Sequence, residues 1–139
     1  MDVSLPPTEG DEYTYERTFD PEDVRAFGEL SGDQQAIHTD PDEDGRLIVQ
    51  GLLTATLPTK IGGDMSYIAR IVELEFYRPV FTGETIACTM VVESVAETDD
   101  RYEVECSGIC TNEADEVVMD GTFDGIVRKD GTDGDDHER

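Results

Sequence analysis

The chain has 139 residues, of which 34 are Asp or Glu and 10 are Lys or Arg, so its formal net charge is −24 at pH 7. This length allows one domain with a core of its own but not two, and the charge argues against nucleic acid as a partner, because phosphates would be repelled. Hydrophobic residues make up 37% of the chain and recur in strand-like alternation, which argues against a disordered acidic segment.

The acidic residues are spread along the whole chain, and the only lysines are Lys60 and Lys129. An acidic, lysine-poor surface on a foldable core is typical of proteins that stay soluble in concentrated salt, where repulsion is screened. We therefore expect a halophile's cytoplasmic protein. The N-terminus lacks a signal-peptide pattern and no apolar run approaches membrane-spanning length, so no membrane association is expected.

The predicted elements begin with a loose arm over residues 1–11 and a strand over residues 13–19, where aromatic and polar residues alternate. A helix is predicted to start after Asp20, because Asp20 can cap it and Pro21 suits its first position. Gly32 is expected to end this helix. Its apolar stripe consists of Val24, Phe27 and Leu30.

A polar loop is predicted over residues 39–46, followed by a mostly apolar, buried helix over residues 52–61. Pro58 is expected to kink or shorten that helix, and Gly62-Gly63 to end it. The rest of the chain predicts long strands separated by polar turns. This pattern predicts an α+β fold in one domain, an antiparallel sheet wrapped around a helix. The alternating apolar positions are Ile68, Val72, Leu74 and Phe76; Ile86, Cys88, Met90 and Val92; Tyr102, Val104 and Cys106; and Val117, Met119, Phe123 and Val127.

The three cysteines form no metal-binding pattern, and Cys106 and Cys110 are too far apart along one strand face to bridge each other. We expect all three to be small buried residues in a reducing compartment. Residues 130–139 are expected to be a disordered acidic tail, in which His137 is inert.

The candidate catalytic residues are Asp33, directly after the helix-ending glycine, and His38 in the following segment. A carboxylate and an imidazole together can hold a water, take its proton and return one. By themselves these residues have plain alternatives, because aspartate is common in turns and His38 precedes a polar loop.

Three segments in order give the chain a resemblance to the MaoC-like, (R)-specific enoyl-CoA hydratases. The first is residues 19–38, which hold the Asp33–His38 pair; the second, residues 45–55 (GRLIVQGLLTA), is similar to the segment that enters the family's central helix. The third, residues 76–85 (FYRPVFTGET), looks like the strand and turn that follow. The resemblance extends over residues 13–128 and implies the hot dog fold for a domain at residues 1–129, usually as a homodimer.

The resemblance also implies roles for individual residues. Asp33 and His38 would hold the water that adds across the double bond of a trans-2-enoyl thioester, giving a 3-hydroxyacyl product. The backbone N–H of Gly51 would bind the thioester oxygen, although Gly51 also suits a plain turn. Thr56 occupies a position where the family often has a small hydroxyl residue near the substrate. The implied substrate is an acyl-CoA, with no metal and no other cofactor.

The chain departs from the family pattern Asp-x-Asn-Pro-x-His, because Gln35 and Ala36 occupy the Asn and Pro positions. It also has Gln50 where the family often has histidine before the helix glycine. These changes motivate a second hypothesis, a non-catalytic acyl-thioester-binding or partner subunit. A thioesterase on the same fold is a third, disfavoured because the Asp-to-His spacing follows the hydratase pattern.

Overall fold

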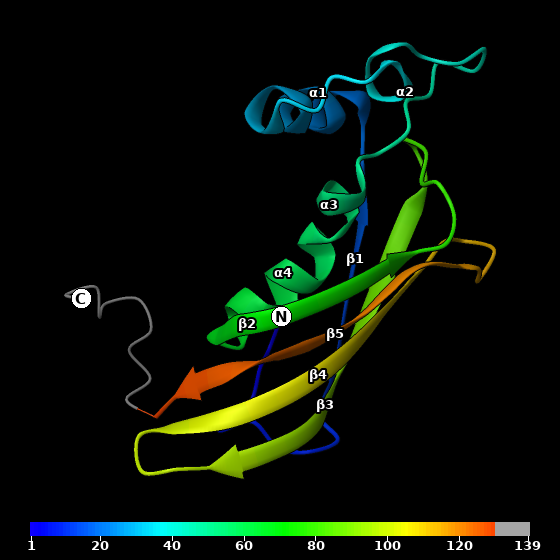
Figure 1. The fold of residues 1–139 in the computed structure, drawn as a ribbon. Helices are drawn as coiled ribbons and strands as arrows, with labels where there is room; N and C mark the ends of the chain where they lie inside the picture. The colour runs from blue at the N-terminus through cyan, green and yellow to red at the C-terminus, as the bar shows by residue number, and fades with distance from the viewer. Residues whose placement is uncertain (130–139) are drawn as a thin grey trace.

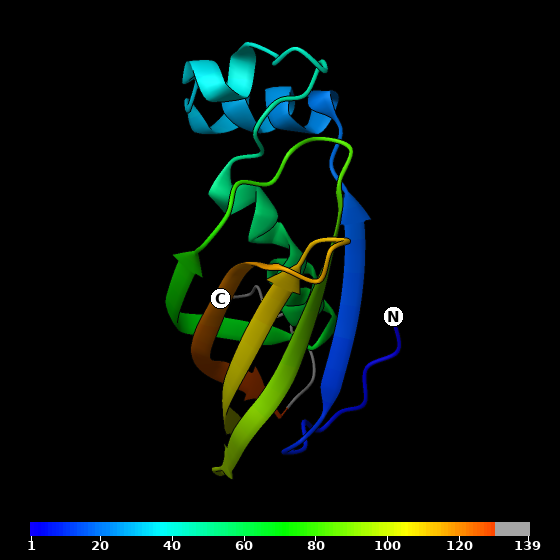
Figure 2. The same cartoon turned by 90° about the vertical axis from the view of Figure 1, so that its right-hand side faces the viewer.

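The computed structural model describes residues 1–129, in which five antiparallel strands form one sheet in the order β1-β3-β4-β5-β2. The sheet curls around helix α4, while α1 and α2 lie together at one end, next to the start of α3 (Figure 1, Figure 2). This arrangement confirms the predicted α+β fold. The strands are β1 (Glu12–Thr18), β2 (Tyr67–Phe76), β3 (Thr85–Glu97), β4 (Arg101–Thr111) and β5 (Val117–Arg128), and the helices are α1 (Pro21–Ser31), α2 (Ala36–Thr39), α3 (Gly51–Thr54) and α4 (Thr56–Asp64).

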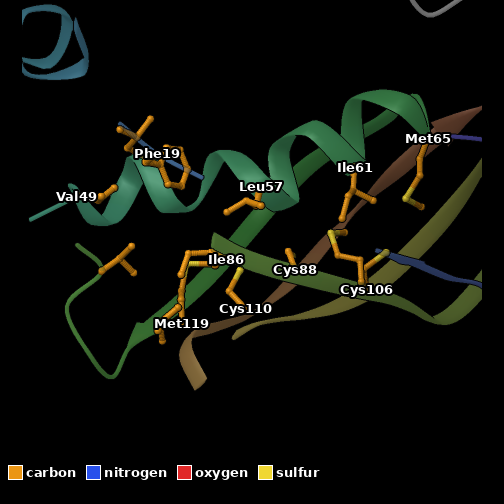
Figure 3. Packing of buried hydrophobic residues seen from close by; sticks show 14 of the residues in the cluster. Phe19, Val49, Leu57, Ile61, Met65, Ile86, Cys88, Cys106, Cys110 and Met119 are labelled. Carbon is orange, nitrogen blue, oxygen red and sulfur yellow. The ribbon is translucent and has the colours of Figure 1, made fainter. Parts of the chain in front are cut away.

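The core lies between α4 and the concave face of the sheet. Leu57 and Ile61 point from α4 toward β3, where Ile86 and Cys88 face them (Figure 3). The predicted alternation of β3 is confirmed, because Ile86, Cys88, Met90 and Val92 are all buried. Burying one such side chain contributes about 1.5–3 kcal/mol, so this packing makes α4 a fixed support for the segment that precedes it. Among residues 1–129, no helix has the length and apolar character needed to span a bilayer.

Helix α1 begins and ends as predicted. Asp20 accepts a hydrogen bond from the Asp23 N–H at 2.9 Å, and the Asp23 side chain accepts one from the Asp20 N–H at 3.1 Å, so the two form a capping box. At the other end Gly32 has φ +83°, a left-handed conformation that favours glycine. The sharp turn at Gly32 places Asp33 outside the helix, facing the segment that follows.

The prediction for the central helix was wrong at its C-terminal end. The helix continues through Gly62 and Gly63 to Asp64, although each glycine disfavours helix by about 1 kcal/mol relative to alanine. Ile61 and Met65, on either side of the glycines, are buried in the core, and their packing outweighs the glycine propensity.

An interruption at Ala55 separates α3 from α4, and Pro58 lies in the first turn of α4. The proline has no N–H to bond with the carbonyl of Thr54, so the break falls just before it. The expected disturbance by Pro58 is therefore a break between α3 and α4 and not a shortening, because the two helices together extend from Gly51 to Asp64 and not from Leu52 to Ile61.

Strand β2 forms one edge of the sheet and, among residues 1–129, pairs with β5 alone. Its apolar positions are largely exposed: Val72 and Phe76 each retain 50% of their accessible surface, and Ile71 retains 58%. The predicted stripe thus lies on a strand whose outer edge and apolar side chains are not covered by residues 1–129.

The cysteines are free and buried, as predicted. Cys88 on β3 lies directly opposite Cys110 on β4, a juxtaposition that depends on strand register and was not predicted. The hydrogen bond to Cys88, together with burial, raises the pKa of the Cys110 thiol well above its usual range. Burial likewise raises the pKa of Cys106 to about 11. Both thiols are therefore protonated and unreactive near neutral pH.

Candidate active site

A cavity of about 630 Å³ opens where α1 and α2 meet the start of α3 and the end of β2. Three of the four predicted site residues, Asp33, His38 and Gly51, line it, although they come from separate segments. Gln35, Gln50 and Phe76 line the same cavity. The fold thus brings residues of the three motifs, which are separate in the sequence, together around one cavity.

The Asp33 carboxylate is held by its own loop. Its Oδ1 accepts a hydrogen bond from Gln35 Nε2 at 2.9 Å, and the Asp33 N–H donates to Ser31 Oγ at 3.1 Å. The Gln35 side chain is the largest cause of a lowered Asp33 pKa, and the Gln35 backbone and His38 lower it further. Asp33 is therefore an ionised carboxylate near neutral pH, with 36% of its side chain exposed.

The His38 imidazole is oriented by α2, a short helical turn that was not predicted from the sequence. Ala36 starts this turn, and the His38 N–H donates to the Gln35 carbonyl at 2.8 Å. Nδ1 lies 2.6 Å from the carbonyl oxygen of Ile48. Because a carbonyl only accepts, Nδ1 is the donor, and this contact fixes both the tautomer and the ring plane.

The other ring nitrogen, Nε2, lies 3.5 Å from Asp33 Oδ2. In a neutral ring with its proton on Nδ1, Nε2 and the carboxylate oxygen are two acceptors side by side. A water molecule that donates one hydrogen to each would satisfy both groups. The pair is therefore arranged to hold and polarise a water, and only 7% of the His38 side chain is exposed.

Gly51 begins α3 and lines the same cavity as the Asp33–His38 pair. Within residues 1–129 its N–H donates to no backbone acceptor, as expected for the first residue of a helix. A Cβ at this position would lie 2.9 Å from Cε1 of Phe76, so glycine is needed for the ring to approach the helix start so closely. The N–H of Gly51 is thus free to donate to an oxygen in the cavity.

Thr56 does not line the cavity, contrary to the expectation that it lies near a substrate. Its hydroxyl donates to the carbonyl of Leu53 at 2.5 Å and is committed to the helix. Thr54 lines the cavity instead and is only 2% exposed. The helical period explains the difference, because Thr54 lies one turn beyond Gly51 on the same face and Thr56 does not.

Gln50 and Phe76 are among the cavity residues that were not assigned a role from sequence. Phe76 was read as part of an apolar stripe and as the start of the third motif, and Gln50 as a departure from the usual histidine before Gly51. Gln50 is 2% exposed, and its Nε2 donates to the carbonyl of Val24 at 3.0 Å. Its position next to Gly51 was the one signal that could have pointed to a place in the site.

We expect Gln35→Met to raise the pKa of Asp33 toward its ordinary value, because the substitution removes the strongest hydrogen bond to the carboxylate. An NMR titration of the Asp33 side-chain carboxyl carbon measures this pKa directly. Gln34→Met is the matched control, since no hydrogen bond joins the Gln34 side chain to Asp33 in the described structure. An unchanged pKa in Gln35→Met would contradict the assigned hydrogen bond.

The comparisons with known proteins agree with this geometry. The family model described as MaoC like domain matches residues 4–114. A relative from Arabidopsis thaliana, named mitochondrial 3-hydroxyacyl-[acyl-carrier-protein] dehydratase, is 29% identical over an alignment of 128 residues, and the match covers 85% of this chain and 76% of the relative.

Two solved hydratases have the same fold. R-hydratase PhaJ1 from Pseudomonas aeruginosa superposes with a TM-score of 0.77 and 21% identity, over 88% of this chain and 82% of the other. The (R)-hydratase from A. caviae, described as involved in PHA biosynthesis, gives a TM-score of 0.77 and 22% identity, over 89% and 98% of the two chains. These likenesses confirm the hot dog fold. With the family model matching most of its length, the chain belongs to the MaoC-like domain family.

Proposed function

We propose that this protein adds water to trans-2-enoyl thioesters, giving (R)-3-hydroxyacyl thioesters, and catalyses the reverse dehydration. The observation that carries the proposal is the 3.5 Å approach of Asp33 Oδ2 to His38 Nε2 in a cavity that Gly51 also lines. The names of the relatives, a 3-hydroxyacyl dehydratase and two hydratases, support the same reaction class.

In the proposed reaction, water held between Asp33 and His38 gives one proton to the pair while its oxygen bonds to Cβ of the enoyl group. The pair returns one proton to Cα, so the reaction adds the elements of water with no redox change. General acid–base help of this kind contributes about 10²- to 10⁴-fold in rate. Negative charge that develops on the thioester oxygen is stabilised by the Gly51 N–H, and losing one such donor typically costs about 10²- to 10³-fold.

The Gln35-Ala36 substitution leaves this pair intact, which favours catalysis over the non-catalytic binding hypothesis. Gln35 Nε2 still reaches Asp33, and Ala36 starts the turn that carries His38. The proposed reaction uses the Asp33 and His38 side chains, the Gly51 N–H and the thioester itself, and it needs no other group. We propose coenzyme A as the thioester carrier and the cytoplasm as the location, a reducing compartment that suits three buried free thiols.

A substrate scan tests the function. Purified protein in molar KCl is mixed with enoyl-CoAs of increasing chain length, and loss of enoyl absorbance and release of free thiol are followed together. We expect absorbance to fall without thiol release. Thiol release from acyl-CoA would identify a thioesterase, and tight binding without absorbance change would identify a binding subunit.

We further propose that two copies assemble through β2. In the described part of the chain, one edge of the strand is unpaired and its Ile71, Val72 and Phe76 side chains are exposed. An open apolar edge strand is an aggregation hazard unless another chain covers it. A two-fold pairing of β2 with β2 of a second copy would continue the antiparallel sheet and bury these side chains.

A further inference from the structure

Arg78 is the one Lys or Arg among residues 1–129 that lines the candidate active-site cavity. Its segment runs antiparallel to the segment that leads into α3, and the Val49 N–H donates to the Val80 carbonyl at 2.8 Å. Arg78 comes two residues before Val80, and Gly51 comes two residues after Val49. This pairing therefore brings Arg78 and Gly51 to the same cavity.

The charged end of Arg78 reaches toward the turn between β4 and β5. Its Nη1 lies 3.5 Å from Oε2 of Glu116, a residue of that turn that does not line the cavity. The two side chains retain 51% and 45% of their accessible surface. A pair this exposed contributes at most about 1 kcal/mol. The guanidinium is therefore open to solvent at the cavity entrance, and changing its partner costs little.

Release of Arg78 does not leave Glu116 without a partner. Glu116 Oε1 accepts a hydrogen bond from Asn112 Nδ2 at 3.0 Å, and the Glu116 N–H donates to Asn112 Oδ1 at 3.0 Å. Glu116 therefore keeps its position when the guanidinium turns to another anion. A guanidinium presents a planar fork of N–H donors, which matches the oxygens of a phosphate group.

The charge of the chain gives this cation a place in the proposed function, on which the inference rests. The net charge of −24 opposes the approach of a polyanionic thioester carrier, so a local positive charge is needed where the carrier enters. Apart from Arg78, Asp33 and His38, the described residues that line the cavity are uncharged. An uncharged lining suits the neutral pantetheine arm, whose phosphate lies at the end far from the thioester.

We propose that the guanidinium of Arg78 binds the phosphate at the end of the pantetheine arm and exchanges Glu116 for it when the ligand binds. Coenzyme A and the phosphopantetheine group of acyl carrier proteins share this phosphate. Arg78 thus recognises the carrier and takes no part in the hydration step itself.

The test measures binding separately from turnover, with inert thioethers that share one butyl group. These are S-butyl-CoA, S-butyl-phosphopantetheine and S-butyl-pantetheine, which lacks the phosphate, and calorimetry in molar KCl gives their Kd values. We expect the wild type to bind S-butyl-phosphopantetheine about fivefold more tightly than S-butyl-pantetheine. Arg78→Gln should bind these two equally, should weaken S-butyl-CoA by a similar factor, and should leave S-butyl-pantetheine as before.

Two further variants sharpen the result. Arg101→Gln is the matched control, because it changes the net charge equally and removes an ion pair with Glu103 at 3.0 Å that does not line the cavity. It should keep the preference for the phosphate. Arg78→Lys keeps the charge but loses the planar fork, so it should keep only part of the preference.

Kinetics distinguish the two sources of the phosphate. The wild type and Arg78→Gln are compared on crotonyl-CoA and on the crotonyl thioester of an acyl carrier protein. For the carrier that the protein uses, Arg78→Gln should raise KM about fivefold with kcat unchanged, because the contact is made equally in the ground and transition states.

Other results overturn the proposal. Equal binding of S-butyl-phosphopantetheine and S-butyl-pantetheine by the wild type, an unchanged preference in Arg78→Gln, or a loss confined to S-butyl-CoA would remove Arg78 from this phosphate while leaving the hydratase function standing. Failure of the wild type to hydrate any enoyl thioester would overturn the hydratase function, whereas the phosphate preference is measured independently with the thioethers.

Discussion

Replacing Asp33 by Asn is expected to lower kcat for enoyl-CoA hydration by about 10²- to 10⁴-fold, because the amide cannot take a proton from the water. Asn matches the carboxylate in shape, and its Oδ1 can still accept from Gln35 Nε2, which now bonds to Asp33 at 2.9 Å. The side chain is partly exposed, so we expect little change in thermal stability. Measuring kcat on crotonyl-CoA together with a thermal melting curve separates a loss of catalysis from a loss of folded protein.

The His38→Ala variant should show a loss of similar size, and the Asp33→Asn/His38→Ala double variant little more than either alone, because the two groups act on one water. Asp42→Asn is the matched control. Asp42 is another carboxylate with a lowered pKa, but its partner is Arg46 in the following loop, and it does not line the cavity. Additive losses in the double variant, or an equal loss in Asp42→Asn, would contradict the shared-water arrangement.

Lowering the salt concentration is expected to separate the proposed dimer and then unfold the chain. Each copy carries a formal charge of −24, and repulsion between exposed charges reaches about 10 Å at 0.1 M salt but only about 3 Å at 1 M. Many of the ion pairs within the chain are exposed and therefore weak, such as Arg78–Glu116 at 3.5 Å, so they do little to offset this repulsion. Sedimentation analysis measures the association, and a thermal melt at each salt concentration measures the folding.

We expect dimers in molar KCl, monomers at millimolar KCl, and a fall in Tm of about 4 °C for each kcal/mol of folding free energy lost. Val72→Lys on β2 should give monomers even in molar KCl, since it places a charge on the exposed apolar edge. Thr89→Lys on β3 is the matched control, because Thr89 pairs with Thr14 of β1 on one side and with Ile109 of β4 on the other. A dimer that survives in Val72→Lys would mean that the copies meet elsewhere.

Much of the fold was predictable because local signals and packing agree. Asp20 and Gly32 define the ends of α1, and the alternation of β3 was confirmed residue by residue. The errors arose where tertiary packing overrides local preference. The glycines at 62 and 63 are strong stop signals, yet buried Ile61 and Met65 carry the helix through them.

The meeting of the candidate site residues was predictable only in part. Asp33, His38 and Gly51 were selected because they lie in motifs, and the structure shows that they line one cavity. Their approach to one another depends on contacts that no motif encodes, such as the Ile48 carbonyl on His38 Nδ1. Thr56 was placed by position in the motif alone, and the break at Ala55 puts Thr54 in the cavity instead.

The most direct test of the hydratase proposal is to identify the product that the purified protein forms from crotonyl-CoA in molar KCl. We predict a product heavier by one water, with the hydroxyl at C3 in the R configuration, formed by the wild type and not at a comparable rate by Asp33→Asn. Unchanged crotonyl-CoA, free coenzyme A, or a product of S configuration would contradict the assignment of Asp33, His38 and Gly51 to this reaction.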